Sequence, residues 1–146
     1  MFAEFDYKLF PIVIVKFNKD IDNEEDFNNF LIRWLQLYKN CKEFLFLFDT
    51  TNVGVPPIKY CFRMSSFIKN LRKQKIQYLK KSIIIVKNKK VLRLLNIIFY
   101  LQPPVAPVYL TMDNIDSILN NIKENTTNKI SVIKYIKANK PYLPFL

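Results

Sequence analysis

The sequence predicts an α/β fold, with a mostly parallel sheet of four or five strands flanked by helices. Short apolar runs such as residues 43–48 and 81–88 are continuous rather than alternating, which is typical of central strands covered on both faces. Between them, apolar residues recur at steps of three and four, which is typical of helices with one buried face. The resulting β-α-β-α-β-α-β-α order favours parallel strands joined by helical crossovers.

The first strand is expected at residues 10–17, because this segment is β-branched and apolar. The first helix is expected at 23–40. Asn23 is predicted to cap it, and acidic residues 24–26 follow in the first turn, where the helix dipole favours negative charge. The inner face of this helix is predicted to hold Phe27, Phe30, Leu31, Trp34, Tyr38 and Cys41.

The second strand, 43–48, is followed by a helix that Pro56 and Pro57 are expected to open, since proline is favoured at the first helical position. The inner face of this helix is predicted to hold Cys61, Met64, Ile68 and Leu71. The opposite face is predicted to carry Lys59, Arg63, Lys69 and Lys73.

The rest of the chain continues the alternation. It predicts a strand at 81–88, a helix at 89–102 that ends before Pro103, a strand at 106–112 and a short helix capped by Asp113. We expect residues 1–124 to form one domain, because no repeat or break in composition divides them. Residues 125–146 are expected to form a C-terminal extension, as a short helix or an edge strand, that packs on the domain or on a partner.

The composition excludes several kinds of chemistry. The 146 residues include no His, which removes the commonest general base and the commonest zinc ligand. The single glycine, Gly54, excludes glycine-rich phosphate loops. The two cysteines, Cys41 and Cys61, cannot form a metal site alone and are expected to be reduced core residues. We therefore expect a protein without enzymatic activity, cofactor or metal.

Asp49, Thr50 and Thr51 end an apolar strand and allow two interpretations. One is a ligand site at the carboxyl end of a central strand, where open α/β sheets usually bind ligands. The other is a turn in which the Asp side chain holds nearby backbone N–H groups. The turn is favoured, because the polar residues at the neighbouring strand ends, Asn88 and Asp113, complete no known catalytic set.

Charge is distributed unevenly along the chain. Residues 1–49 carry 6 basic and 9 acidic side chains, residues 50–112 carry 12 basic and no acidic ones, and residues 113–146 carry 5 basic and 3 acidic ones. A basic patch attracts nucleic acid, anionic lipid or an acidic protein face, whereas a solvated lysine-rich surface is the alternative interpretation. Because Lys outnumbers Arg 19 to 4, we expect salt-sensitive attraction rather than sequence readout. The expected patch residues are Lys59, Arg63, Lys69, Arg72, Lys73, Lys80, Lys81, Lys89 and Lys90.

The third helix has more apolar residues than one buried face requires. Leu92, Ile97 and Phe99 fall partly outside the face that Val91 and Ile98 define. Either the C-terminal extension covers these three residues, or they form a contact surface. Coverage by residues 125–146 is favoured because that segment is itself apolar, although its end, "KPYLPFL", could instead dock into a neighbouring subunit.

Neither a secretory signal nor a membrane span is expected. The N-terminus lacks a basic start, and the longest uncharged stretch, 94–112, is interrupted by Pro103 and Pro104. The excess of Lys (19), Ile (18) and Asn (15), whose codons are AT-rich, indicates an AT-rich genome such as that of a large DNA virus or a parasite. We expect a cytoplasmic protein, located in the host cytoplasm or the virion if it is viral.

Three stretches carry a resemblance to a known family: "FLFLFDTTNV", "YLKKSIIIVKNKKVLRLLNIIFYL" and "PVYLTMDNIDSIL". Over residues 8–123 their order and spacing resemble the STAS-like (anti-sigma-factor-antagonist) superfamily and the related CRAL-TRIO lipid-binding domain. The stretch "NVGVPPIKY" lacks the serine that bacterial STAS regulators phosphorylate at this position. The resemblance implies an interaction module of STAS-like type or, alternatively, a lipid binder of CRAL-TRIO type.

The leading functional expectation is a non-enzymatic protein-interaction module that docks through its basic second helix and its apolar third helix. The first alternative is binding of lipid or of an anionic membrane surface. The second is a structural role in a virion or another large assembly. The absence of His, the single glycine and the lack of a paired-carboxylate motif argue against an enzyme.

Overall fold

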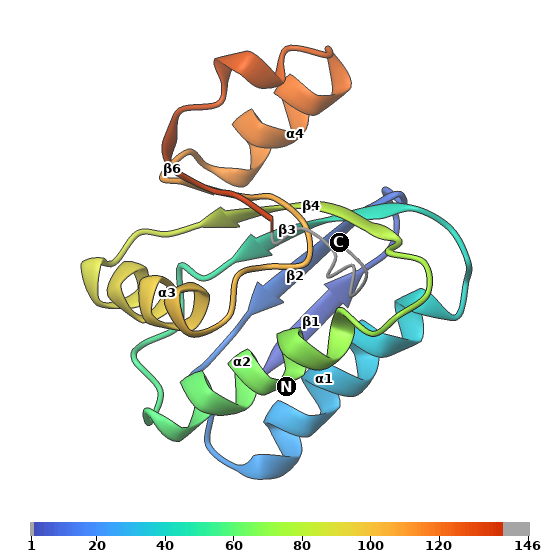
Figure 1. The fold of residues 1–146 in the computed structure, drawn as a ribbon. Coiled ribbons are helices and arrows are strands. Elements are labelled where there is room, and N and C mark those ends of the chain that lie inside the picture. Colours follow the sequence, from blue (N-terminus) through green and yellow to red (C-terminus); the bar gives the residue numbers. More distant parts are fainter. Residues whose placement is uncertain (1, 139–146) are drawn as a thin grey trace.

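The structure, a computed structural model, describes residues 2–138, which form a six-stranded sheet with helices on both sides (Figure 1). The strands follow one another across the sheet in chain order. The α/β class is confirmed, and the sheet has six strands rather than four or five. The strands are β1 (Ala3–Asp6), β2 (Ile12–Phe17), β3 (Phe44–Asp49), β4 (Leu79–Ile85), β5 (Val108–Thr111) and β6 (Val132–Ile136).

Of the four α-helices in residues 2–138, three lie on one side of the sheet and one lies on the other (Figure 1). The three are α1 (Glu24–Tyr38), α2 (Lys59–Leu71) and α3 (Lys89–Leu101). Each joins two neighbouring parallel strands, and right-handed crossovers taken in one direction across a sheet place their helices on the same face. The helix α4 (Ile115–Lys123) and a short 3-10 helix, Thr127–Lys129, instead precede the antiparallel strand β6 and occupy the opposite face.

The two strands beyond the four expected in the β-α alternation, β1 and β6, form the two edges of the sheet. β1 pairs antiparallel with β2, with Ala3 and Phe5 buried and Glu4 exposed. β6 pairs antiparallel with β5 and forms part of the expected C-terminal extension, for which an edge strand was one of two predictions. Residues 139–146, the remainder of that extension, lie outside the described residues.

Three local predictions at helix ends are wrong. Pro56 and Pro57 do not open α2, which begins at Lys59 after Ile58 at the cap position. Asn114 rather than Asp113 caps α4 and accepts the backbone N–H of Ser117 at 2.8 Å. Asp113 is engaged elsewhere, because its carboxylate accepts the backbone N–H of Ser131 at 2.9 Å. Cys41 is exposed rather than buried, since α1 ends at Tyr38 and Cys41 turns the chain away with a φ of 53°. By contrast, the predicted cap Asn23 does accept the backbone N–H of Asp26 at 2.8 Å.

The core on the three-helix side is built on β3. Phe44, Phe46 and Phe48 face this side, and neighbouring ring centroids lie 5.2 and 4.5 Å apart. Trp34 of α1 packs edge-on against Phe46 at 4.8 Å. Leu47 points to the other side, where it packs with residues of α4. The continuous apolar run therefore serves two separate cores, as expected of a strand covered on both faces.

Replacement of Phe46 by alanine tests this central position. Phe46 has no exposed surface, so Phe46→Ala is expected to lower the free energy of unfolding by about 3–5 kcal/mol through lost burial and a residual cavity. Urea denaturation measures this change. Tyr100→Ala, at a side chain that is 88% exposed, is the control and should change stability by less than about 0.5 kcal/mol. Equal effects of the two substitutions would contradict the assignment of Phe46 to the core.

Candidate functional site

The most distinctive feature of the interior is a partly open cavity of about 160 Å³ between the sheet and helices α1, α2 and α3. We call it the apolar pocket. Its floor includes Phe48, Ser82 and Val108 of the sheet, and its roof includes Trp34, Met64 and Leu95 of the helices. Protein interiors are normally packed as densely as organic crystals and contain few voids larger than a water molecule. A cavity of this volume therefore needs an explanation.

A small side chain at the centre of the sheet accounts for part of this space. Ser82 of β4 is buried and lines the pocket. Its register partners on the two neighbouring strands are Phe46 and Val108. At the position between a phenylalanine and a valine, the sheet therefore carries only a hydroxymethyl group. The helices above it contact each other through Cys61, Ile68 and Ile98.

The described wall of the pocket carries no formal charge. Among residues 2–138, those that line it include no Asp, Glu, Lys or Arg. Burial raises the pKa of the Cys61 thiol, so this lining residue remains a neutral thiol at physiological pH. The hydroxyl of Thr50, at one end of the pocket, donates to the carbonyl of Ile85 at 2.6 Å. Such a wall can accommodate an uncharged apolar molecule, whereas an ion would lose its hydration without compensation.

The segment Asp49–Thr51 forms a hydrogen-bonded turn beside the pocket. The Asp49 carboxylate accepts the backbone N–H of Thr51 at 3.0 Å and its hydroxyl at 2.5 Å. Thr50 also donates its backbone N–H to Ile85, and Val53 donates its own to Thr50. The polar groups of this segment are thus largely engaged in shaping the exit from β3. Of Asp49, Thr50 and Thr51, only Thr50 lines the pocket.

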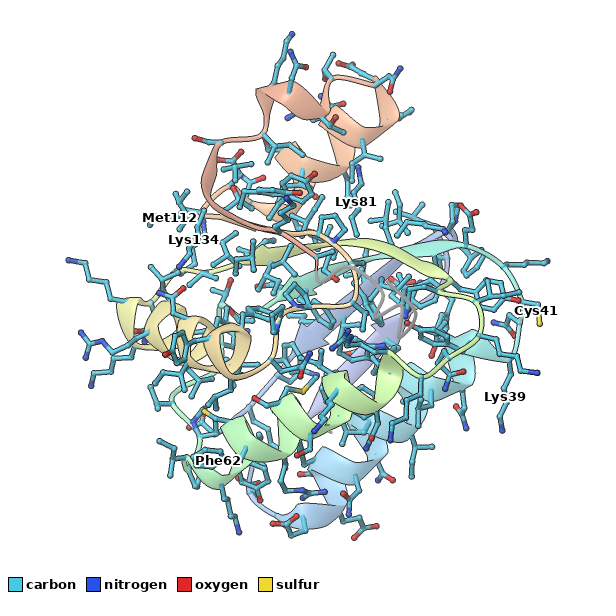
Figure 2. All side chains as sticks on the ribbon, viewed as in Figure 1. Lys39, Cys41, Phe62, Lys81, Met112 and Lys134 are labelled. Atoms are coloured by element: carbon cyan, nitrogen blue, oxygen red, sulfur yellow. The ribbon has the colours of Figure 1, made fainter. Side chains whose placement is uncertain are left out.

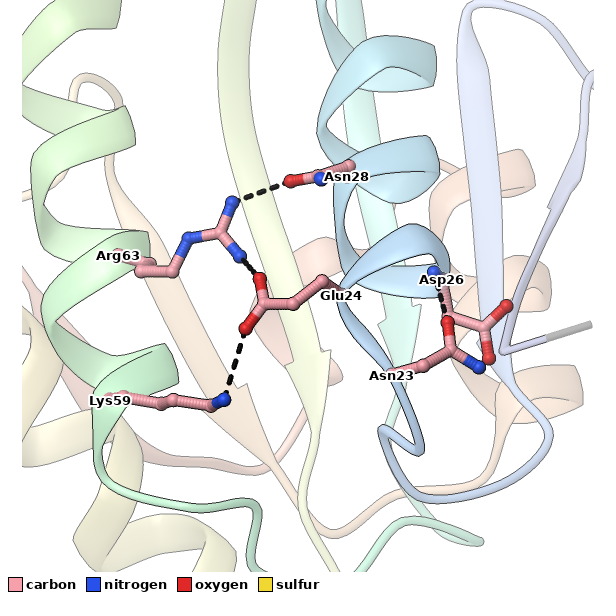
Figure 3. A network of polar contacts seen from close by, with 6 residues as sticks. All are labelled: Asn23, Glu24, Asp26, Asn28, Lys59 and Arg63. Carbon is pink, nitrogen blue, oxygen red and sulfur yellow. Dashed lines mark hydrogen bonds and ion pairs between the residues drawn. The ribbon is translucent and has the colours of Figure 1, made fainter.

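The basic residues expected to form one patch lie at several separate places. Lys59 and Arg63, in the first half of α2, both pair with Glu24 of α1, and Arg63 also donates to Asn28 (Figure 3). Lys81 is half-buried on the α4 side of the sheet, away from α2 (Figure 2).

The remaining members divide between the two ends of the strands. Lys89 and Lys90 begin α3 at the carboxyl ends of the strands, and both are exposed. Lys80, which lies 3.7 Å from Glu43, belongs to the opposite end. The last three expected residues, Lys69, Arg72 and Lys73, lie in the last turn of α2 or directly after it and belong to that same amino end.

The apolar residues of α3 divide in a similar way. Leu92 and Phe99 are half-buried and pack against the main core, and Phe99 lines the pocket. Ile97 is 37% exposed. The most exposed apolar surface of α3 instead belongs to Tyr100 and Leu101, at 88% and 44%.

The pocket was not predicted from the sequence. Its one local signal is Ser82, a polar residue at the start of the otherwise apolar run "SIIIV". That signal becomes informative only when the register places Ser82 between Phe46 and Val108.

Neither a metal site nor a membrane-spanning helix emerges from residues 2–138. Within them, no three side chains among His, Cys, Asp and Glu are grouped as metal ligands. No helix in the same range is long and apolar enough to cross a bilayer. Comparison of the chain with protein-family models, with curated proteins and with solved structures finds no match. The STAS-like and CRAL-TRIO resemblance therefore stays a prediction.

The Glu24 network predicts a measurable pH dependence. A hydrogen bond from Lys59, helped by the charge of Arg63, lowers the pKa of Glu24 below its ordinary value of 4.5. A carboxyl group whose pKa is lower in the folded state than in the unfolded state stabilises the folded state at pH values above its ordinary pKa. This stabilisation is lost as the pH falls through the folded-state pKa. The stability of the wild type should therefore fall more steeply than that of Glu24→Gln as pH is lowered below 4.5.

Urea denaturation at several pH values measures this difference. Glu25→Gln, one position along the same turn of α1, is the matched control, and it should retain the steep dependence of the wild type. Parallel curves for wild type and Glu24→Gln would show that the network contributes nothing to stability.

Proposed function

We propose that the protein is a non-enzymatic binding module that holds a small uncharged apolar molecule in the apolar pocket. The observation that carries this proposal is the pocket itself, a cavity of about 160 Å³ with an uncharged and almost entirely apolar wall. An engineered protein cavity of about 150 Å³ with a comparable lining stays dry and binds benzene. A ligand with the bulk of a single ring or a short branched chain is therefore the best match.

The driving force for such binding is the removal of apolar surface from water. Transfer into an apolar site is favourable by roughly 25 cal/mol per Å² of buried apolar area. A pocket that is already formed needs little reorganisation, which keeps the cost of binding low. Aromatic rings from β3 and α1 surround the site and restrict its shape, since Trp34 packs against both Phe46 and Phe48. Selectivity should therefore depend on ligand shape more than on hydrogen bonds.

The proposal takes up one of the expectations drawn from the sequence. Lipid binding of CRAL-TRIO type belongs to the same chemical class, but the volume of the pocket suits a fragment of a lipid better than a whole one. Protein docking through α2 and α3, and a structural role in a virion or other assembly, stay predictions. Copurification of one stoichiometric protein partner that survives moderate salt would favour them over the pocket.

The test is thermal unfolding with benzene as the probe. At ten times its dissociation constant, a ligand that binds only the folded state adds about 1.4 kcal/mol, which corresponds to a few degrees in Tm for a chain of this length. We expect this increase for the wild type. Trp34, the single tryptophan of the chain, lines the pocket, so its emission spectrum should change in the same titration.

A pair of matched serine substitutions tests whether the binding site is the pocket. Ser82→Leu should occupy the floor of the pocket and abolish the benzene-induced rise in Tm. Ser66→Leu, at an exposed position of α2, should leave the rise unchanged. A wild type that does not respond to benzene, or a Ser82→Leu variant that responds as strongly as the wild type, would refute the proposal.

A further inference from the structure

A second surface, remote from the pocket chemistry, lies where the parallel strands begin. The loops that enter β2, β3 and β4 are residues 7–11, 39–43 and 72–78, and we call their combined surface the amino edge. Backbone hydrogen bonds hold the loops side by side. Leu45 donates to the carbonyl of Pro11 at 2.9 Å, and Phe44 donates to that of Tyr78 at 3.0 Å. Figure 2 shows Lys39 and Cys41 projecting from this end of the molecule.

The amino edge is strongly basic. Its three loops contain six basic side chains and one acidic side chain, Glu43, which gives a net charge of +5. Glu43 lies 3.7 Å from Lys80, a further cation at the start of β4. All the lysines of the three loops are exposed. The basic side chains of the loops are Lys8, Lys39, Lys42, Arg72, Lys73 and Lys75.

A cluster of acidic residues lies at the opposite end of these strands. Where β2 ends and α1 begins, five acidic residues occur within seven positions. They are Asp20, Asp22, Glu24, Glu25 and Asp26. Cations stand beside these carboxylates, since Lys59 and Arg63 pair with Glu24 and α3 begins with two exposed lysines at the same end, so the charge there is mixed. An anionic surface is therefore attracted more strongly to the amino edge, where one carboxylate stands among six cations.

Exposed apolar side chains occupy the same loops as these cations. Leu9 is 49% exposed, Ile76 is 58% exposed, and Tyr7 and Phe10 are 45% and 37% exposed. Burial raises the pKa of Tyr7, so its phenol stays neutral at physiological pH. Lysines that flank apolar and aromatic side chains are typical of surfaces that lie in the interface of an anionic bilayer. The lysines meet charged headgroups there, and the apolar groups enter the boundary with the acyl chains.

We propose that the amino edge binds an anionic membrane surface, with Leu9 and Ile76 entering the headgroup region. A single-stranded nucleic acid would also be attracted by the charge, but its bases require flat side chains for stacking. Tyr7 and Phe10 are flat, but they are less exposed than Leu9 and Ile76, which are aliphatic and cannot stack. Five of the six cations in the loops are lysines, and lysine is a weaker reader of phosphate geometry than arginine.

This inference is independent of the proposed pocket function. The residues on which it depends, Leu9, Lys73, Lys75 and Ile76, are not among those that line the pocket. Failure of benzene to bind would leave the membrane proposal intact, and failure of membrane binding would leave the pocket proposal intact.

The experiment is co-sedimentation of the full chain with phosphatidylcholine vesicles that contain or lack phosphatidylserine. The wild type should bind the anionic vesicles only. Binding should weaken as salt rises from about 0.1 M, where charges interact over about 10 Å, to about 1 M, where they interact over about 3 Å. Binding to both kinds of vesicle alike, or to neither, would overturn the proposal.

Two pairs of variants locate the contact. Lys73→Gln with Lys75→Gln should lower the partition coefficient about tenfold or more, because each lysine near an anionic surface contributes separately. Lys89→Gln with Lys90→Gln removes the same charge at the opposite end of the strands and should have a much smaller effect. Ile76→Ser should also weaken binding, whereas Ile58→Ser, at a residue that is 62% exposed before α2, should not.

The controls separate a specific surface from general attraction to a basic protein. Equal losses from the two lysine pairs would assign binding to the overall charge of +11 and overturn the proposal. Binding of an oligothymidylate without binding of anionic vesicles would assign the edge to nucleic acid and overturn it as well. Circular dichroism of each variant confirms that a loss of binding is not a loss of fold.

Discussion

The alternation of side chains along β3 is the constraint on which the rest of the structure depends. The three phenylalanines of this strand share one face and its two leucines share the other, so a slip of one residue would exchange the two cores. The aromatic face is covered by α1, α2 and α3, whereas the leucine side is covered by α4 (Figure 1). Part of the apolar pocket results from this arrangement, because Ser82 places a small side chain in register between Phe46 and Val108 on the aromatic face.

The sequence predicts most of the helices and strands, but it does not predict which residues from distant segments become neighbours. Asn23 caps α1 as predicted. Phe27, Phe30, Trp34 and Tyr38 of the predicted inner face are buried, whereas Cys41 lies beyond the helix and is exposed. β1 escaped prediction because only two of its four residues face the core and its partner β2 lies beyond a turn. At α4, two adjacent residues are both able to cap, and only the position of Ser131 decides that Asp113 is engaged elsewhere. The pocket and the amino edge depend on neighbours from distant segments, which no local pattern contains.

The order of strands and helices explains why one basic stretch of sequence does not form one basic surface. A chain that alternates strands and helices returns to each end of the sheet in turn. Residues 50–112, which contain no carboxylate, therefore contribute lysines both to the start of α3 and to the loop before β4. The first half of α2 lies against acidic α1 (Figure 3), and the ion pairs there use Lys59 and Arg63 within the molecule. The more concentrated positive charge is that of the amino edge, and it comes from loops in three separate parts of the chain.

The antiparallel strands at the two margins affect how the molecule behaves at high concentration. An unpaired strand margin offers free N–H and C=O groups to which another chain can add. Both margins are short, at four and five residues, and both carry charge: Glu4 and Asp6 on β1, and Lys134 on β6, which also donates to Asn96 at 2.7 Å. Pairing of two copies through the same margin, β1 with β1 or β6 with β6, would bring like charges together. Symmetric pairing of this kind is therefore disfavoured, whereas the loops of the amino edge take no part in strand pairing and stay available for binding.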